Sequence, residues 1–142
     1  ALKEDGTIPD NQIKMLSDFG EFVKINQDGI YNTRPWKIYG EGPLKIVTKR
    51  AGENLKKFSE KDIRITSKDG NLYAFVLAAP TEDILIKTLN KGGILQKKIK
   101  KIKLLGSDEK VTWHQEKDGL VIKNNFKDLP NQPAICFKIT LK

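Results

Sequence analysis

The spacing of apolar residues changes once along this chain, from a helical period to a strand-like period. Near the N-terminus apolar side chains recur every three to four residues, which predicts an amphipathic helix over residues 8–27. Its apolar stripe consists of Ile13, Met15, Leu16, Phe19, Phe22, Val23 and Ile25. Thr7 is positioned to cap this helix, Pro9 suits its first turn, and Gly29 is expected to end it.

After residue 43, short segments of alternating or continuous apolar character recur at intervals of roughly 8–15 residues. The candidate strands are 44–48, 62–66, 72–77, 84–86, 99–105, 111–115, 120–122 and 135–141. Residues 67–70 (Ser-Lys-Asp-Gly) predict a tight hairpin turn. The loops are too short for crossover helices, which favours antiparallel sheets. The expected fold is mainly β: an antiparallel β-sandwich of about eight strands, preceded by one amphipathic α-helix.

Residues 30–43 separate the two patterns and combine helix-breaking residues with large aromatic ones. Pro35 and Pro43 restrict the backbone, while Gly40 and Gly42 allow angles that other residues resist. The aromatic residues of the segment are Tyr31, Trp36 and Tyr39. A flexible spacer would be rich in Gly and Ser instead. We therefore interpret the segment as an ordered connector that packs against structure on both sides.

This connector resembles the junction of family 29 glycoside hydrolases, the α-L-fucosidases. In that family a TIM-type barrel ends in a helix, followed by I-Y-x-T-R/K-P-W-x-x-Y-G-E-G-P and a C-terminal β-sandwich. The matching positions here are Tyr31, Thr33, Arg34, Pro35, Trp36, Tyr39, Gly40, Glu41, Gly42 and Pro43. Segments 62–66, 72–74 and 103–107 extend the resemblance over nearly the whole chain. It implies a remnant barrel helix plus ordered linker over residues 1–43 and a C-terminal β-sandwich domain over residues 44–142.

The resemblance also implies a role without chemistry of its own. The family hydrolyses α-L-fucosides with retention through two carboxylates, and both come from the barrel. We therefore expect no catalytic residue and no enzymatic activity in this chain alone, which would be a fragment of a glycoside hydrolase packed on its catalytic TIM barrel. The expected domain-packing residues are Tyr31, Arg34, Trp36 and Tyr39. Glu41 is expected to accept hydrogen bonds from the backbone of its own Gly-Glu-Gly sequence.

An accessory contact with a fucosylated glycan is a further expectation, because sugar rings stack on exposed aromatic side chains. The carbohydrate-binding candidates are Trp36, Tyr39 and Trp113. An aromatic residue of a strand or connector is more often part of a core, and alternation with Thr112 and His114 favours an inward-facing Trp113. A stand-alone carbohydrate-binding module is the first alternative function.

A basic nucleic-acid-binding domain is the second alternative, since the chain has a net charge of +8. Lysine supplies almost all of that charge, whereas base and phosphate recognition favours the planar fork of arginine. We therefore expect no nucleic-acid partner and interpret the lysine-rich residues 97–103 as a solvated strand edge. The single cysteine and single histidine exclude a disulfide framework and a structural zinc site, and we expect no metal or cofactor.

The sequence contains no apolar run close to the ~20 residues that a membrane-spanning helix requires. Residues 1–6 have no apolar segment typical of a signal peptide, as expected also of an internal fragment. The compartment stays open, although we expect the parent protein to be secreted or periplasmic. The apolar stripe of the helix is expected to dock on the chain's own sandwich or to pair with a second copy.

Overall fold

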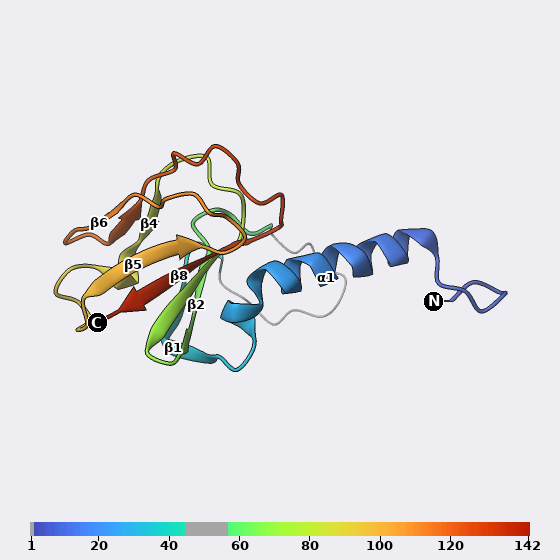
Figure 1. Cartoon of the computed structure of the whole chain (residues 1–142), viewed down its shortest axis with the longest axis horizontal. Coiled ribbons are helices and arrows are strands. Elements are labelled where there is room, and N and C mark those ends of the chain that lie inside the picture. Colours follow the sequence, from blue (N-terminus) through green and yellow to red (C-terminus); the bar gives the residue numbers. More distant parts are fainter. Residues whose placement is uncertain (1, 45–56) are drawn as a thin grey trace.

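The computed structural model describes residues 2–44 and 57–142. Over these residues the chain forms one α-helix, one short 3₁₀ helix and eight strands in two antiparallel sheets, which confirms the predicted mainly-β fold (Figure 1). The elements are α1 (Asp10–Ile30), β1 (Arg34–Glu41), β2 (Ile63–Lys68), β3 (Asn71–Val76), β4 (Ile84–Ile86), the 3₁₀ helix η1 (Lys87–Leu89), β5 (Ile99–Leu104), β6 (Trp113–Gln115), β7 (Leu120–Ile122) and β8 (Ile135–Leu141). The candidate strand at 44–48 lies outside the described residues except for Leu44.

The two sheets enclose the main hydrophobic core. The larger sheet has the strand order β1-β2-β3-β8-β5, and the smaller has the order β4-β7-β6. The alternation of β8 predicts its two faces correctly: Ile135, Phe137 and Ile139 lie in the core between the sheets, whereas Cys136 lies in a separate cluster on the other side. Burial of these side chains is the main force that holds the two sheets together.

The hairpin between β2 and β3 forms where the sequence predicts it. Asp69 and Gly70 both have positive φ, 51° and 77°, as a two-residue turn of the type that joins twisted antiparallel strands requires. Lys68 pairs directly with Asn71 across this turn. The register continues without a slip to Ile63 opposite Val76, so each strand presents alternate residues to the core.

The segment that we expected to be a connector forms a strand of the sandwich. Arg34–Glu41 is β1, which lies at the edge of the larger sheet and pairs with β2 through a register shift between Pro35 and Gly40. An edge position explains why a strand can contain Pro35, because its missing N–H removes no internal ladder bond.

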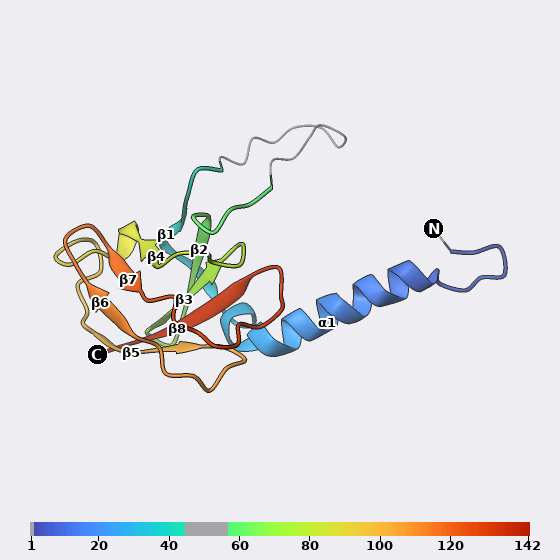
Figure 2. The ribbon, with the colours of Figure 1, turned by 90° about the horizontal axis from the view of Figure 1, so that it is seen from above.

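The helix differs from the expectation at both ends. It begins at Asp10 with Pro9 as its N-cap residue, and the Thr7 hydroxyl donates to Asp5 Oδ1 at 2.6 Å and does not cap the helix. Gly29 does not end the helix but lies within its last turn, which continues to Ile30. A Cβ at Gly29 would lie 3.0 Å from Cys136 Sγ, so the absence of a side chain allows the helix to approach the sheet closely. Figure 2 shows that only this C-terminal end of α1 reaches the sandwich.

Candidate functional site

The C-terminal end of α1 is anchored to the outer face of the larger sheet by one carboxylate. Asp28 Oδ1 accepts a hydrogen bond from Lys68 Nζ at 2.8 Å, and Asp28 Oδ2 accepts from Lys138 Nζ at 2.8 Å. The Tyr73 hydroxyl also donates to Oδ2 at 3.1 Å. The hydrogen bonds from Lys138 and Lys68 lower the pKa of Asp28 to about 2. The helix therefore joins the sheet through an ionised cluster that links α1, β2, β3 and β8.

A small apolar cluster supports the same junction. Its buried members on the sheet side are Tyr73, Phe75, Leu105 and Cys136. Phe22 and Ile30 of the helix pack against this cluster, and the Thr66 hydroxyl donates to the Gly29 carbonyl at 3.0 Å. Burial raises the pKa of the Cys136 thiol, so this cysteine is a packing group and not a reactive thiolate.

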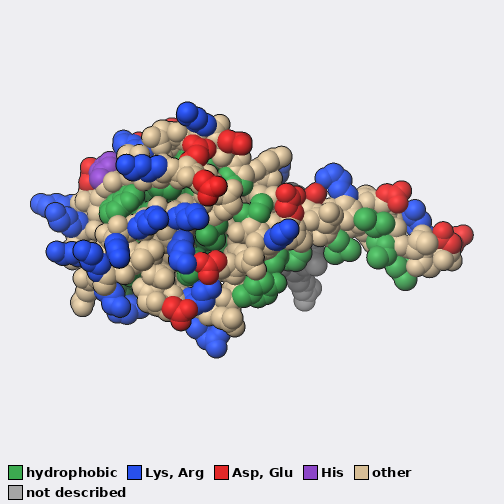
Figure 3. Space-filling view, viewed as in Figure 1, with side chains coloured by type: hydrophobic (Ala, Val, Ile, Leu, Met, Phe, Trp, Pro, Cys, Tyr) green, Lys and Arg blue, Asp and Glu red, His purple; other side chains and the backbone are tan. Residues whose placement is uncertain are grey.

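The N-terminal half of α1 projects away from the sandwich and leaves an apolar surface exposed. We call Ile13, Met15, Leu16 and Phe19 the helix face; these side chains are 51–67% exposed. Figure 3 shows hydrophobic side chains gathered along the projecting helix, while Lys and Arg side chains spread over the sandwich. For this half, docking on the chain's own sandwich, the first of the two expected arrangements, does not occur. Pairing of the helix with a second copy stays a prediction. A hollow of about 770 Å³ lies beside the helix face, lined also by Asn131, Gln132 and Pro133.

The four residues expected to pack against a neighbouring domain occupy different environments. Trp36 is half-buried and packs against the core between the sheets. Tyr31 and Tyr39 are exposed, at 56% and 68%, and Arg34 is also at the surface. Three of the four are therefore accessible to another domain, whereas Trp36 already contributes to this one.

Glu41 connects the two sheets through backbone hydrogen bonds. Its two carboxylate oxygens accept from the backbone N–H groups of Lys87 and Thr88, each at 2.8 Å, in the first turn of η1. Glu41 thus accepts backbone hydrogen bonds, as expected, but from η1, so the expected partners in the Gly-Glu-Gly sequence were wrong. The distant partners could not be read from the sequence, because η1 follows β4 in the other sheet.

Gly42 of the same motif allows the backbone just after β1 to lie close to Asp62. Gly42 has a φ of 131°, and a Cβ there would lie 2.5 Å from Asp62 Oδ1. Asp62 is buried and accepts hydrogen bonds from the backbone N–H groups of Leu44 and Ser59 at 2.9 and 2.7 Å. Burial alone would raise the pKa of Asp62, but these hydrogen bonds outweigh it and the net pKa is lowered. This carboxylate is a structural acceptor.

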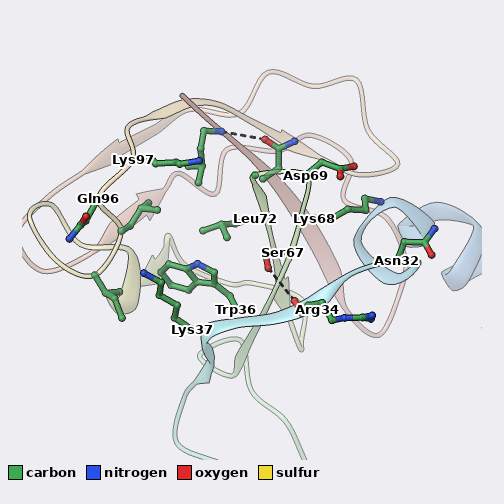
Figure 4. A pocket seen from close by; sticks show the side chains of 15 residues that line it. Asn32, Arg34, Trp36, Lys37, Ser67, Lys68, Asp69, Leu72, Gln96 and Lys97 are labelled. Carbon is green, nitrogen blue, oxygen red and sulfur yellow. Dashed lines mark hydrogen bonds between the residues drawn. The ribbon is translucent and has the colours of Figure 1, made fainter.

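A groove beside Trp36 is the second feature that could serve a function. We call it the Trp36 groove; it has a volume of about 560 Å³ (Figure 4). Its cationic lining residues are Arg34, Lys37, Lys68 and Lys97, and its one carboxylate is Asp69. Trp36 is the only one of the three carbohydrate-binding candidates that lines it. Sequence reasoning missed Lys37 and Lys97, which belong to β1 and to the loop before β5.

The other two carbohydrate-binding candidates lie elsewhere. Tyr39 is an exposed residue of β1, and Trp113 lies on β6 of the smaller sheet, half-buried against the core as the alternation predicted. His114, next to Trp113, lies with its Nε2 2.9 Å from Glu116 Oε1. The structure therefore does not bring the three aromatic candidates into one site.

Within residues 2–44 and 57–142, no three His, Cys, Asp or Glu side chains are grouped in a way that could hold a metal ion. Over the same residues, no helix has the length and hydropathy needed to span a bilayer.

Solved structures share this fold over nearly the whole chain. The α-L-fucosidase isoenzyme 1 of Paenibacillus thiaminolyticus superposes with a TM-score of 0.66 at 20% identity, covering 100% of this chain and 29% of that one. The Thermotoga maritima α-fucosidase in complex with fucose has a TM-score of 0.64 at 22% identity, covering 99% of this chain and 29% of that one. These similarities define the class of protein: a β-sandwich domain that carries a helix at its N-terminal side.

Sequence comparison identifies the family. The model of the α-L-fucosidase C-terminal domain matches residues 56–140, and this chain belongs to that family. An α-L-fucosidase of Dictyostelium discoideum is 30% identical over 83 residues, which cover 57% of this chain. The chain spans 14% and 29% of the lengths of the two curated relatives that it matches. The resemblance noted from residues 30–43 is thus confirmed.

Proposed function

We propose that this chain is the non-catalytic C-terminal domain of an α-L-fucosidase and that it packs on a catalytic barrel through α1. The observation that carries the proposal is the helix face, whose four large side chains are more than half exposed. Burying each of them against another domain would contribute roughly 1.5–3 kcal/mol before ordering costs. The small share of each relative that this chain spans is consistent with a larger domain elsewhere in the parent protein.

The same proposal assigns α1 to the edge of the barrel and the strands to the C-terminal domain. The division expected from the sequence, with residues 1–43 as helix plus linker and 44–142 as sandwich, remains a proposal. The pairing of β1 with β2 ties the linker part of residues 1–43 to the sandwich. We infer that Tyr31 and Tyr39, which are accessible, contribute to the contact with the barrel. Arg34, also expected there, lines the Trp36 groove, and we assign it no part in that contact.

The environment of the carboxylates supports a non-catalytic role. A general acid of a glycosidase needs a raised pKa, which an apolar pocket or a second carboxylate supplies. Here hydrogen bonds lower the pKa values of carboxylates instead. The donor to Asp28 is Lys138, and the donor to Asp83 is Lys123. The donor to Glu109 is the backbone N–H of Lys127. We expect no turnover of an aryl α-L-fucoside by this chain alone. Activity that persists through independent purifications would contradict this.

The packing role is tested in the full-length parent enzyme with the double variant Leu16→Glu and Phe19→Glu. We expect this variant to lower the unfolding temperature and to expose the segment after α1 to limited proteolysis, because two charges would be buried without partners. Leu85→Glu, at an exposed apolar residue of β4, is the matched control and should change neither property. A double variant with the same unfolding temperature and the same resistance to proteolysis as the wild type would overturn the proposal.

We further propose an accessory contact with sugar at the Trp36 groove, supported by the aromatic ring that lines it. A stand-alone carbohydrate-binding module would share this contact but would leave the helix face without a partner. The test with the parent enzyme therefore separates the two functions. A nucleic-acid-binding domain is less well supported, since the groove has a single aromatic platform on which a base could stack.

A further inference from the structure

The Trp36 groove carries more positive charge than a neutral sugar would require. Its lining includes four cationic side chains but only one carboxylate, Asp69. Lys68 is engaged by Asp28, yet neither Lys37 nor Lys97 forms an ion pair among the described residues. Within residues 2–44 and 57–142, the Arg34 guanidinium donates a single hydrogen bond, to the Thr33 carbonyl, and this bond is long at 3.4 Å. Among the described residues, three cations at the groove therefore have no carboxylate partner and can contact a ligand.

Figure 4 shows how these groups surround the indole ring. Lys37 and Gln96 lie on one side of Trp36, and Arg34 lies on the other, so the cations are spread along the groove and not gathered at one point. A ligand that satisfied them all would carry negative charges at intervals along its length. Lysine binds such groups as a point charge, and arginine can bind a carboxylate or sulfate through two parallel hydrogen bonds.

The ring itself is held in place, as a stacking platform must be. Trp36 belongs to β1 and packs against the core, so it is half-buried and not a mobile surface side chain. The apolar C–H face of a sugar ring is complementary to the electron-rich face of an indole. Asn71 and Gln96 supply amide groups within reach of hydroxyls in the same groove. The volume of about 560 Å³ is that of a site for a few sugar units or one small ligand.

We propose that the Trp36 groove binds an acidic oligosaccharide. One sugar ring stacks on Trp36, and carboxylate or sulfate groups of the neighbouring sugars contact Arg34, Lys37 and Lys97. This inference rests on the proposed accessory sugar contact and adds the chemical class of its ligand. Nucleic acid is disfavoured because only one aromatic side chain lines the groove, whereas single strands bind along successive stacking platforms.

The position of the groove agrees with a role separate from domain packing. The loop before β5 and the C-terminal end of β8 contribute to its wall, and both lie at the opposite end of the molecule from the N-terminal half of α1 (Figures 1 and 2). A barrel that covers the helix face would therefore leave the groove accessible. The two contacts can be tested independently.

Calorimetric titration of the 142-residue chain at physiological salt tests the inference. The probes are oligogalacturonate, a dextran sulfate oligosaccharide, neutral dextran, a neutral fucosylated oligosaccharide and single-stranded DNA. We expect binding of at least one of the two acidic saccharides and weaker binding or none for the other probes. Which acidic probe binds distinguishes carboxylate from sulfate recognition, and raising the salt concentration should weaken the complex.

Two variants with the same change in charge locate the site. Lys37→Glu with Lys97→Glu should weaken acidic-saccharide binding roughly tenfold or more, because both residues line the groove. Lys100→Glu with Lys101→Glu, at exposed positions of β5 outside the groove, should leave the dissociation constant within about twofold. Trp36→Leu preserves apolar contact with the core but removes the stacking face, and should also abolish tight binding.

Several outcomes would overturn the inference. Equal losses in the two lysine pairs would indicate diffuse attraction by the whole charged surface. DNA binding as tight as the saccharide would indicate a general polyanion surface. Binding of the neutral fucosylated oligosaccharide alone would retain the accessory sugar contact and reject the acidic ligand. None of these results depends on the helix face. The packing proposal is therefore tested separately, by the double variant of Leu16 and Phe19 in the parent enzyme.

Discussion

Asp28 of α1 and Lys138 of β8 lie 2.8 Å apart, although 110 residues separate them in the sequence. Their ion pair joins the only α-helix among the described residues to an inner strand of the larger sheet, since β8 lies between β3 and β5. Lys68 approaches the same carboxylate from β2 at 2.8 Å. The direction in which the helix projects therefore depends on this cluster.

Asp28→Asn should loosen the end of the helix and lower the free energy of unfolding by roughly 1–2 kcal/mol. The expected loss of stability is modest because the Asp28 side chain is 39% exposed and solvent screens its ion pair with Lys138. Urea unfolding monitored by circular dichroism measures the change. Asp18→Asn is the control, because Asp18 pairs with Lys14 on the exposed part of the helix and should change stability by about 0.5 kcal/mol or less.

The same carboxylate predicts a pH dependence. The folded-state pKa of Asp28 is lowered from 3.8 to about 2, so its contribution to stability is complete above the unfolded-state pKa. That contribution is lost as the pH falls through the folded-state value, because the unfolded state binds the proton first. The lowered pKa values of Asp62, Asp83 and Glu109 act in the same direction. Stability should therefore fall on acidification from about pH 5 to pH 2, and less steeply in Asp28→Asn.

Two glycines of α1 should respond to alanine with opposite signs. At Gly29 a Cβ would lie 3.0 Å from Cys136 Sγ and from Phe75 Cζ, so Gly29→Ala should push the helix from the sheet and destabilise the chain by about 1–3 kcal/mol. At Gly20 no described atom outside the helix lies within 4 Å of the added Cβ. Gly20→Ala should stabilise by about 0.5–1 kcal/mol through helix propensity. Thermal unfolding of both variants checks the contrast, and equal effects would contradict the close approach at Gly29.

Glu41→Gln should separate a structural role from a catalytic one. The amide keeps one acceptor oxygen, so one of the two η1 hydrogen bonds is lost and stability should fall by about 1 kcal/mol. In the parent enzyme we expect an unchanged pH profile and an unchanged kcat on an aryl α-L-fucoside. A kcat reduced by orders of magnitude at unchanged stability would show that Glu41 takes part in the chemistry.

The sequence by itself determined the succession of elements. The change of apolar period predicted one α-helix followed by strands. Residues adjacent in the chain were also enough to predict the Asp69–Gly70 turn, the two faces of β8 and the family. Such features are local, because a strand or helix exposes its face through its own repeat. The sequence also assigned residues 30–43 to a connector, because prolines and glycines usually mark breaks between elements. In the structure Arg34–Glu41 is an edge strand, where proline is tolerated.

Only the tertiary structure decided which distant groups meet. Glu41 reaches η1, Asp28 reaches Lys138, and Lys97 joins Lys37 beside Trp36 because the order of strands in the sheets places them together. The hydrophobic period specifies the face on which a residue lies but not the neighbour of its strand. It likewise predicts the apolar stripe of α1 without saying how much of it the sandwich covers. The sandwich covers only the C-terminal end of α1, because the close contact at Gly29 holds that end against the sheet. The helix face, in the N-terminal half, stays exposed.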